Sequence, residues 1–63
     1  MTTLAEDAFT KLWDTALDAM LSRNHEAALK AFLAADKLKP GDPKVLANIR
    51  RLDDMGVRQE NLS

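Results

Sequence analysis

The residues of this 63-residue chain that could do chemistry are few and scattered. Asp14 and Asp18 lie four residues apart, a spacing that places two carboxylates on one side of a helix, where they could serve as an acid–base pair. No nucleophile, oxyanion donor or pocket-forming pattern accompanies them, so exposed helix carboxylates are the simpler interpretation. We therefore predict that the chain is not an enzyme and expect no small-molecule substrate.

Metal and cofactor binding are not expected either. His25 is the only histidine and the chain has no cysteine, so it offers neither a thiolate site nor a set of imidazole ligands. No glycine-rich phosphate loop is present. His25 is interpreted as a first-turn helix residue beside a bend. The lack of cysteine also fits a reducing compartment.

The charge pattern argues against nucleic acid and membrane as partners. Nine basic and ten acidic residues leave a net charge of −1, without the basic excess of a nucleic-acid binder. No apolar run reaches the roughly 20 residues of a membrane span, and the N-terminus lacks a signal-peptide pattern. We expect a soluble, cytoplasmic protein, and the initial Met1 favours a complete chain. The basic residues of the last third, which are interleaved with Asp42, Asp53 and Asp54, are read as a solvated surface: Lys44, Arg50, Arg51 and Arg58.

Apolar residues at helical spacing are the most informative feature of the chain. A helix is predicted over 4–21, starting at a capping box formed by Thr3 and Glu6. Its apolar residues form two adjacent rows that together cover nearly half of the circumference, which is wider than one neighbouring helix requires. The first row is Leu4, Ala8, Leu12, Ala16 and Met20, and the second is Phe9, Trp13, Leu17 and Leu21.

Two further helices are predicted over 25–38 and 43–55. Asn24 and Asp42 are expected as their N-caps, while Pro40-Gly41 and Gly56 are expected to end them. Small residues on one side of the second helix allow close approach of a neighbour, and the short polar break before Asn24 predicts an antiparallel hairpin. The small residues are Ala28, Ala31 and Ala35, with Phe32 beside them. We thus predict one all-α domain over 1–63, a helical hairpin plus a third capping helix, with a flexible tail over 58–63.

The run Ala28, Phe32, Ala35, Pro40 resembles the second helix and exit turn of a tetratricopeptide repeat. The first helix resembles that family less closely, because Leu12 stands where the family usually has Trp and Ala19 where it has Tyr. The resemblance covers about one repeat plus a following helix and implies an αα-superhelix architecture. In this family the first helices line a concave binding surface. Carried over, its usual contact positions are Thr10, Trp13, Leu17, Met20 and Leu21.

Two interpretations of the second row remain open. Its residues either belong to the core of a three-helix domain or stay exposed as anchors for a protein partner. The exposed interpretation predicts a non-catalytic adaptor or assembly module that binds a helix or peptide of another protein, a second copy of itself as a homodimer, or both. Trp13 and Leu17 stand where a carboxylate-clamping groove would need a cation and an amide, so that activity is not expected. The alternative function is a small chaperone for an aggregation-prone partner such as a secretion-system subunit. The candidate protein-binding residues are Phe9, Trp13, Leu17, Met20 and Leu21.

Overall fold

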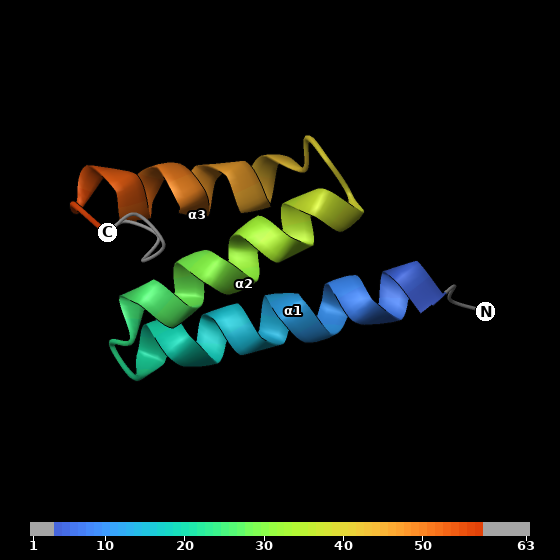
Figure 1. Ribbon diagram of the computed structural model, residues 1–63, viewed down its shortest axis with the longest axis horizontal. Helices are drawn as coiled ribbons and strands as arrows, with labels where there is room; N and C mark the ends of the chain where they lie inside the picture. The colour runs from blue at the N-terminus through green and yellow to red at the C-terminus, as the bar shows by residue number, and fades with distance from the viewer. Residues whose placement is uncertain (1–3, 58–63) are drawn as a thin grey trace.

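Three helices build the domain. The computed structural model describes residues 4–57 and contains α1 (Leu4–Leu21), α2 (His25–Leu38) and α3 (Pro43–Asp54), as Figure 1 shows. No strand occurs within these residues, so the predicted all-α fold is confirmed. α1 and α2 form an antiparallel hairpin, and α3 packs on α2 and runs in the same direction as α1 (Figure 1). The predicted capping residue Thr3 and the predicted tail over 58–63 lie outside the described residues.

Side-chain caps fix the starts of α2 and α3, as expected from the sequence. The carboxamide oxygen of Asn24 accepts a hydrogen bond from the Ala27 N–H at 3.3 Å. The carboxylate of Asp42 accepts bonds from the N–H groups of Lys44 at 2.9 Å and Val45 at 3.3 Å. Each cap satisfies backbone donors that a helix start leaves without an intrahelical partner. The chain therefore enters both helices at defined residues.

The ends of α1 and α3 share one hydrogen-bond pattern but differ in the residue that makes the turn. After α1, the N–H of Asn24 donates to the Ala19 carbonyl at 2.8 Å and that of Arg23 to the Met20 carbonyl at 3.0 Å. This Schellman pattern needs a left-handed residue, here Arg23 with φ of 61°. At the end of α3 the same position holds Gly56 with φ of 87°, as predicted. A non-glycine residue in this conformation costs roughly 1–2 kcal/mol, so the α1–α2 turn is strained at one residue.

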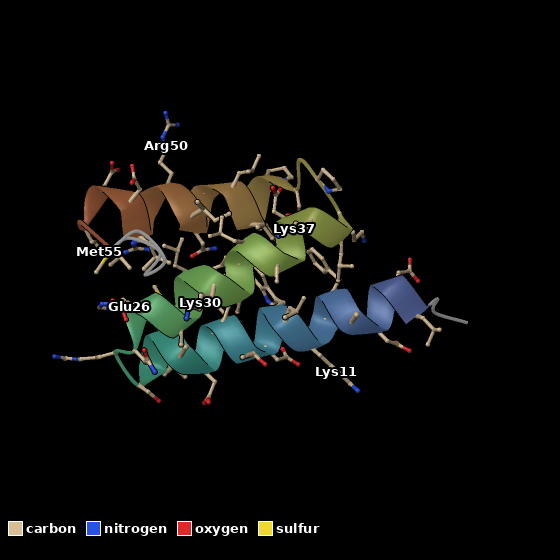
Figure 2. The ribbon with its side chains drawn as sticks, in the orientation of Figure 1. Lys11, Glu26, Lys30, Lys37, Arg50 and Met55 are labelled. Atoms are coloured by element: carbon tan, nitrogen blue, oxygen red, sulfur yellow. The ribbon has the colours of Figure 1, made fainter. Side chains whose placement is uncertain are left out.

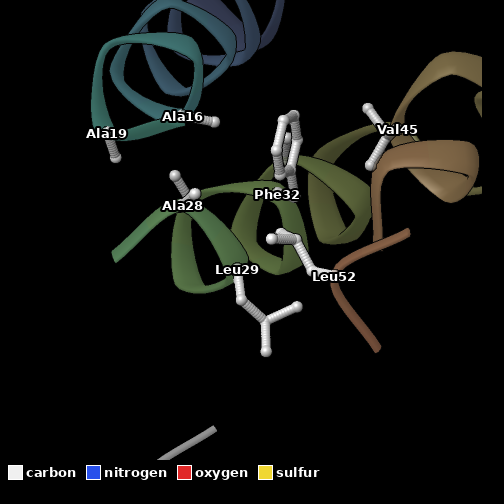
Figure 3. Close-up of a cluster of buried hydrophobic side chains, with 9 residues drawn as sticks. Ala16, Ala19, Ala28, Leu29, Phe32, Val45 and Leu52 are labelled. Atoms are coloured by element: carbon white, nitrogen blue, oxygen red, sulfur yellow. The ribbon is translucent and has the colours of Figure 1, made fainter. Parts of the chain in front are cut away.

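The core of the domain is small and rich in alanine. Figure 3 shows Ala16 and Ala19 of α1 facing α2 near Ala28, with Phe32 between the α1 alanines and Val45 of α3. Among the residues whose burial the structure describes, five of the nine buried apolar residues are alanines, and Phe32 is the largest of the nine. Small side chains let α1 and α2 approach closely, and the Phe32 ring fills the space toward both neighbouring helices. The buried residues are Ala16, Ala19, Ala28, Leu29, Ala31, Phe32, Ala35, Val45 and Leu52.

One residue of the first apolar row, Leu4, is not covered by α2. Leu4 is 86% exposed, although it belongs to the same predicted row as the fully buried Ala16. The reason is length: α1 has 18 residues and α2 has 14. At about 1.5 Å per residue, the first turn of α1 extends about 6 Å beyond the helix that would cover it (Figure 1).

Replacing Arg23 by glycine should stabilise the domain. The Arg23→Gly variant relieves the left-handed strain at the cost of a more flexible unfolded chain, for a net gain of about 0.5–1 kcal/mol in the free energy of unfolding. Urea denaturation followed by circular dichroism measures this gain. The matched control, Gly56→Ala, should lose about 1 kcal/mol from backbone strain alone, because an added Cβ there meets nothing within 4 Å. A destabilised Arg23→Gly variant would argue against a left-handed Arg23.

Truncating Phe32 should abolish cooperative folding. We expect Phe32→Ala to lower the free energy of unfolding by about 3–5 kcal/mol, which is most of the stability that a domain of this size has. Thermal denaturation by circular dichroism provides the measurement. The control Leu38→Ala removes a side chain that is 40% exposed and should change the stability by less than about 1 kcal/mol. Equal effects of the two variants would contradict the central place of Phe32 in the core.

Candidate protein-interaction surface

The five predicted contact residues all keep some accessible surface in the monomer. Leu21 is 85% exposed and Leu17 is 39% exposed. The other three are partly buried and pack against the edge of the core. None of the five belongs to the buried core, whereas the α1 residues that do are Ala16 and Ala19. We call this set the α1 apolar face: Phe9, Trp13, Leu17, Met20 and Leu21.

Trp13 has features of both a core residue and an exposed anchor, the two interpretations that the sequence left open. Its ring meets the ring of Phe32 edge to face, with centroids 5.6 Å apart and planes at 70°. This geometry suits the charge distribution of aromatic rings and adds stability beyond the area buried. Trp13 therefore covers the core from α1, yet it remains partly accessible from outside. Leu17, one turn further along, is the more exposed of the two.

The ammonium group of Lys39 lies at the Phe9 end of the α1 apolar face. The ammonium nitrogen of Lys39, the C-cap residue of α2, lies 5.0 Å from the centroid of the Phe9 ring. An ammonium at this distance is attracted by the negative ring face, typically by about 0.5–1 kcal/mol at exposed sites. The contact joins the end of α2 to α1 and leaves a positive charge beside the aromatic ring.

A cavity of about 150 Å³ opens between the first half of α1 and the start of α3. Three of its lining residues, Phe9, Thr10 and Trp13, come from α1 at positions i, i+1 and i+4. Such residues form three of the four corners of the hole that receives one side chain of a facing helix in knobs-into-holes packing. We call it the α1–α3 cavity, and its remaining lining residues are Asp42 and Lys44.

The charged groups at the α1–α3 cavity differ in whether they already have hydrogen-bond partners within the chain. The Asp42 carboxylate is engaged by backbone N–H groups at the start of α3. Lys44 is exposed, and Lys39 lies on the Phe9 ring that lines the cavity. The start of a helix also carries a partial positive charge. The cavity thus offers an aromatic wall with a positive rim, an arrangement that can hold an apolar side chain flanked by carboxylates.

Sequence reasoning located the α1 part of this site but missed the part that later segments contribute. Thr10 and Trp13 were named from α1 alone, whereas Lys44 was read as part of a solvated surface and Lys39 was not connected with α1. Their place at the cavity follows from the parallel course of α1 and α3, which brings the α2–α3 turn beside the first half of α1 (Figure 1). The sequence did indicate this arrangement in one way, because a hairpin followed by a second short turn brings the third helix back parallel to the first.

The other candidate chemical groups do not form a site. Asp14 and Asp18 are both exposed on α1, and His25 is the first residue of α2. Within residues 4–57, no group of three or more His, Cys, Asp or Glu side chains is placed to hold a metal ion. Over the same residues, no helix is both long and apolar enough to cross a membrane.

Comparison with known proteins returns no relative. No protein-family model, no curated protein and no solved structure matches this chain.

Proposed function

We propose that this chain is a non-catalytic protein-interaction module, similar to a minimal tetratricopeptide-repeat unit, that binds another protein molecule through the α1 apolar face. The observation that carries the proposal is the distribution of side-chain size on α1. The buried residues of α1 are alanines, while its large apolar residues all keep more accessible surface. Large apolar side chains gain about 1.5–3 kcal/mol each from full burial, so a helix that leaves them partly or largely exposed is suited to a partner.

The chemistry of the face indicates what kind of partner it fits. It presents aromatic, leucine and methionine side chains along several turns of one helix, a surface that accepts the apolar side of another helix. Trp13 at its middle is partly preordered by the contact with Phe32, which lowers the entropy lost on binding. The α1–α3 cavity supplies a socket for one anchor side chain.

The arrangement of helices agrees with the resemblance seen in the sequence. A hairpin followed by a helix parallel to its first helix is what one repeat and the start of the next would form. In that family the first helices line the binding surface, and here the proposed face lies on α1. This agreement supports the proposal alongside the size distribution.

Site-specific photocrosslinking tests the proposed function. A photoreactive residue at position 17 of the full chain should give defined adducts, with a second copy in purified protein or with another protein in a lysate of the source cells. The matched control is position 50, because Arg50 extends from the outer side of α3, away from α1 and α2 (Figure 2). We expect adducts at position 17 and not at position 50.

Two results would count against this function. The absence of adducts at position 17 in both preparations would mean that no protein contacts the face. Equal labelling at positions 17 and 50 would mean that the contacts are unspecific. The mass of an adduct at position 17 separates self-association from binding to a different protein.

A further inference from the structure

We propose that the partner is a second copy of this chain and that Leu17 of each copy fills the α1–α3 cavity of the other. This inference rests on the proposed function and specifies its partner and register. The two copies would meet along α1 in antiparallel orientation, related by a two-fold axis near Trp13. Such an interface uses the same surface patch on both copies, as closed dimers do.

The spacing along α1 is self-complementary about Trp13. Phe9 precedes Trp13 by four residues and Leu17 follows it by four, which is about 6 Å in each direction. Two antiparallel copies crossing at Trp13 therefore place Leu17 of one copy opposite Phe9 of the other, and the reverse. Because Phe9 lines the cavity, this register places Leu17 of each copy at the cavity of the other copy.

The size of the cavity fits the side chain that the register delivers. A cavity of about 150 Å³ is large enough to bind a benzene molecule in other proteins, and the four-carbon side chain of leucine is smaller than benzene. Leu17 is 39% exposed and so has surface to give up on association. The corners formed by Phe9, Thr10 and Trp13 are those of a hole for one helical knob.

Charges on the two sides of the contact are complementary. Leu17 is flanked on α1 by Asp14 and Asp18, both exposed. Lys44 lines the cavity, and Lys39 lies on its Phe9 wall. Insertion of Leu17 brings the two carboxylates toward the two ammonium groups, and the two-fold axis repeats this at the second cavity. The net charge of −1 adds little repulsion between copies.

These observations favour a second copy over an unrelated helix. The knob, the cavity and both sets of charges lie on one chain, so the surface needs no other protein to complete it. Dimerisation would also stabilise the fold, because a chain of about 60 residues buries only about 60% of its unfolded surface as a monomer.

Charge reversal with mixing tests the register. Lys44→Glu reverses the cavity side, and the double variant Asp14→Lys/Asp18→Lys reverses the knob side. Each variant alone sets like charges against each other at both cavities, so we expect its dimer dissociation constant to rise at least tenfold in sedimentation equilibrium. In an equimolar mixture both cavities again meet opposite charges, and a heterodimer of near wild-type affinity should form. Native mass spectrometry identifies it.

The variants are chosen to keep the fold. Glu in the first turn of α3 suits the helix dipole, and Asp14 and Asp18 are exposed, so circular dichroism should be unchanged at a protein concentration high enough to keep each variant dimeric. The control Arg50→Glu makes the same change in net charge as Lys44→Glu on the outer side of α3 and should leave the dimer intact (Figure 2).

Four outcomes would overturn the inference, and they separate it from the proposed function. A wild-type dimer that Lys44→Glu leaves unchanged, or a mixture that forms no heterodimer, excludes this register. A wild-type monomer at all concentrations that crosslinks from position 17 to a different protein excludes the second copy but keeps the interaction function. A monomer that gives no adduct from position 17 excludes both.

Discussion

The packing of the Phe32 ring is the interaction on which the rest of the structure depends. The ring is fully buried in α2, where Trp13 of α1 meets it edge to face and Val45 of α3 faces it from the other side (Figure 3). The contact between α1 and α2 otherwise uses mainly small side chains, which allow close approach but bury little apolar area each. One aromatic side chain thus links both helix interfaces, and the position of α3 relative to α1 is set through it. The α1–α3 cavity is a consequence of that placement.

The close packing of α1 on α2 also explains why the α1 apolar face stays accessible. Ala16 and Ala19 occupy the side of α1 that faces α2, so Leu17 and Leu21 lie on another side of the helix, where they are exposed. A monomer of 63 residues buries only a modest share of the surface that its unfolded chain exposes, so it has little stability in reserve. Stability and association are therefore coupled in this account: the side chains that the monomer leaves uncovered are those that a second copy would bury. Trp13 belongs to both sets, because it contacts Phe32 and remains partly accessible.

Local features could be predicted from the sequence because local residues determine them. Asn24 and Asp42 cap the helices they precede, and Gly56 adopts the left-handed conformation that ends α3. Features that depend on how helices are placed could not be predicted in this way. Leu4 fits the apolar row but lies beyond the end of α2, and the contact of Trp13 with Phe32 depends on the rotation of α1 about its axis. The cavity needs Lys44 of α3 beside Phe9 of α1, two residues that no pattern within one helix connects.

The left-handed Arg23 belongs to the second group for a different reason. The short break between the first two helices was apparent from the polar residues, but nothing in an arginine marks a positive φ. Glycine or asparagine at that position would have indicated the motif. The close alanine contact between α1 and α2 instead requires a tight turn, and the chain tolerates a strain of roughly 1–2 kcal/mol at one residue.

The coupling of folding to dimerisation is tested most directly by sedimentation equilibrium of the wild-type chain over about a hundredfold range of concentration, with circular dichroism on the same samples. We expect a dimer at high concentration whose helicity falls as dilution dissociates it, because association completes the burial that the alanine core begins. A monomer with undiminished helicity at every concentration would contradict it, since the alanine core and Phe32 would then suffice without a second copy.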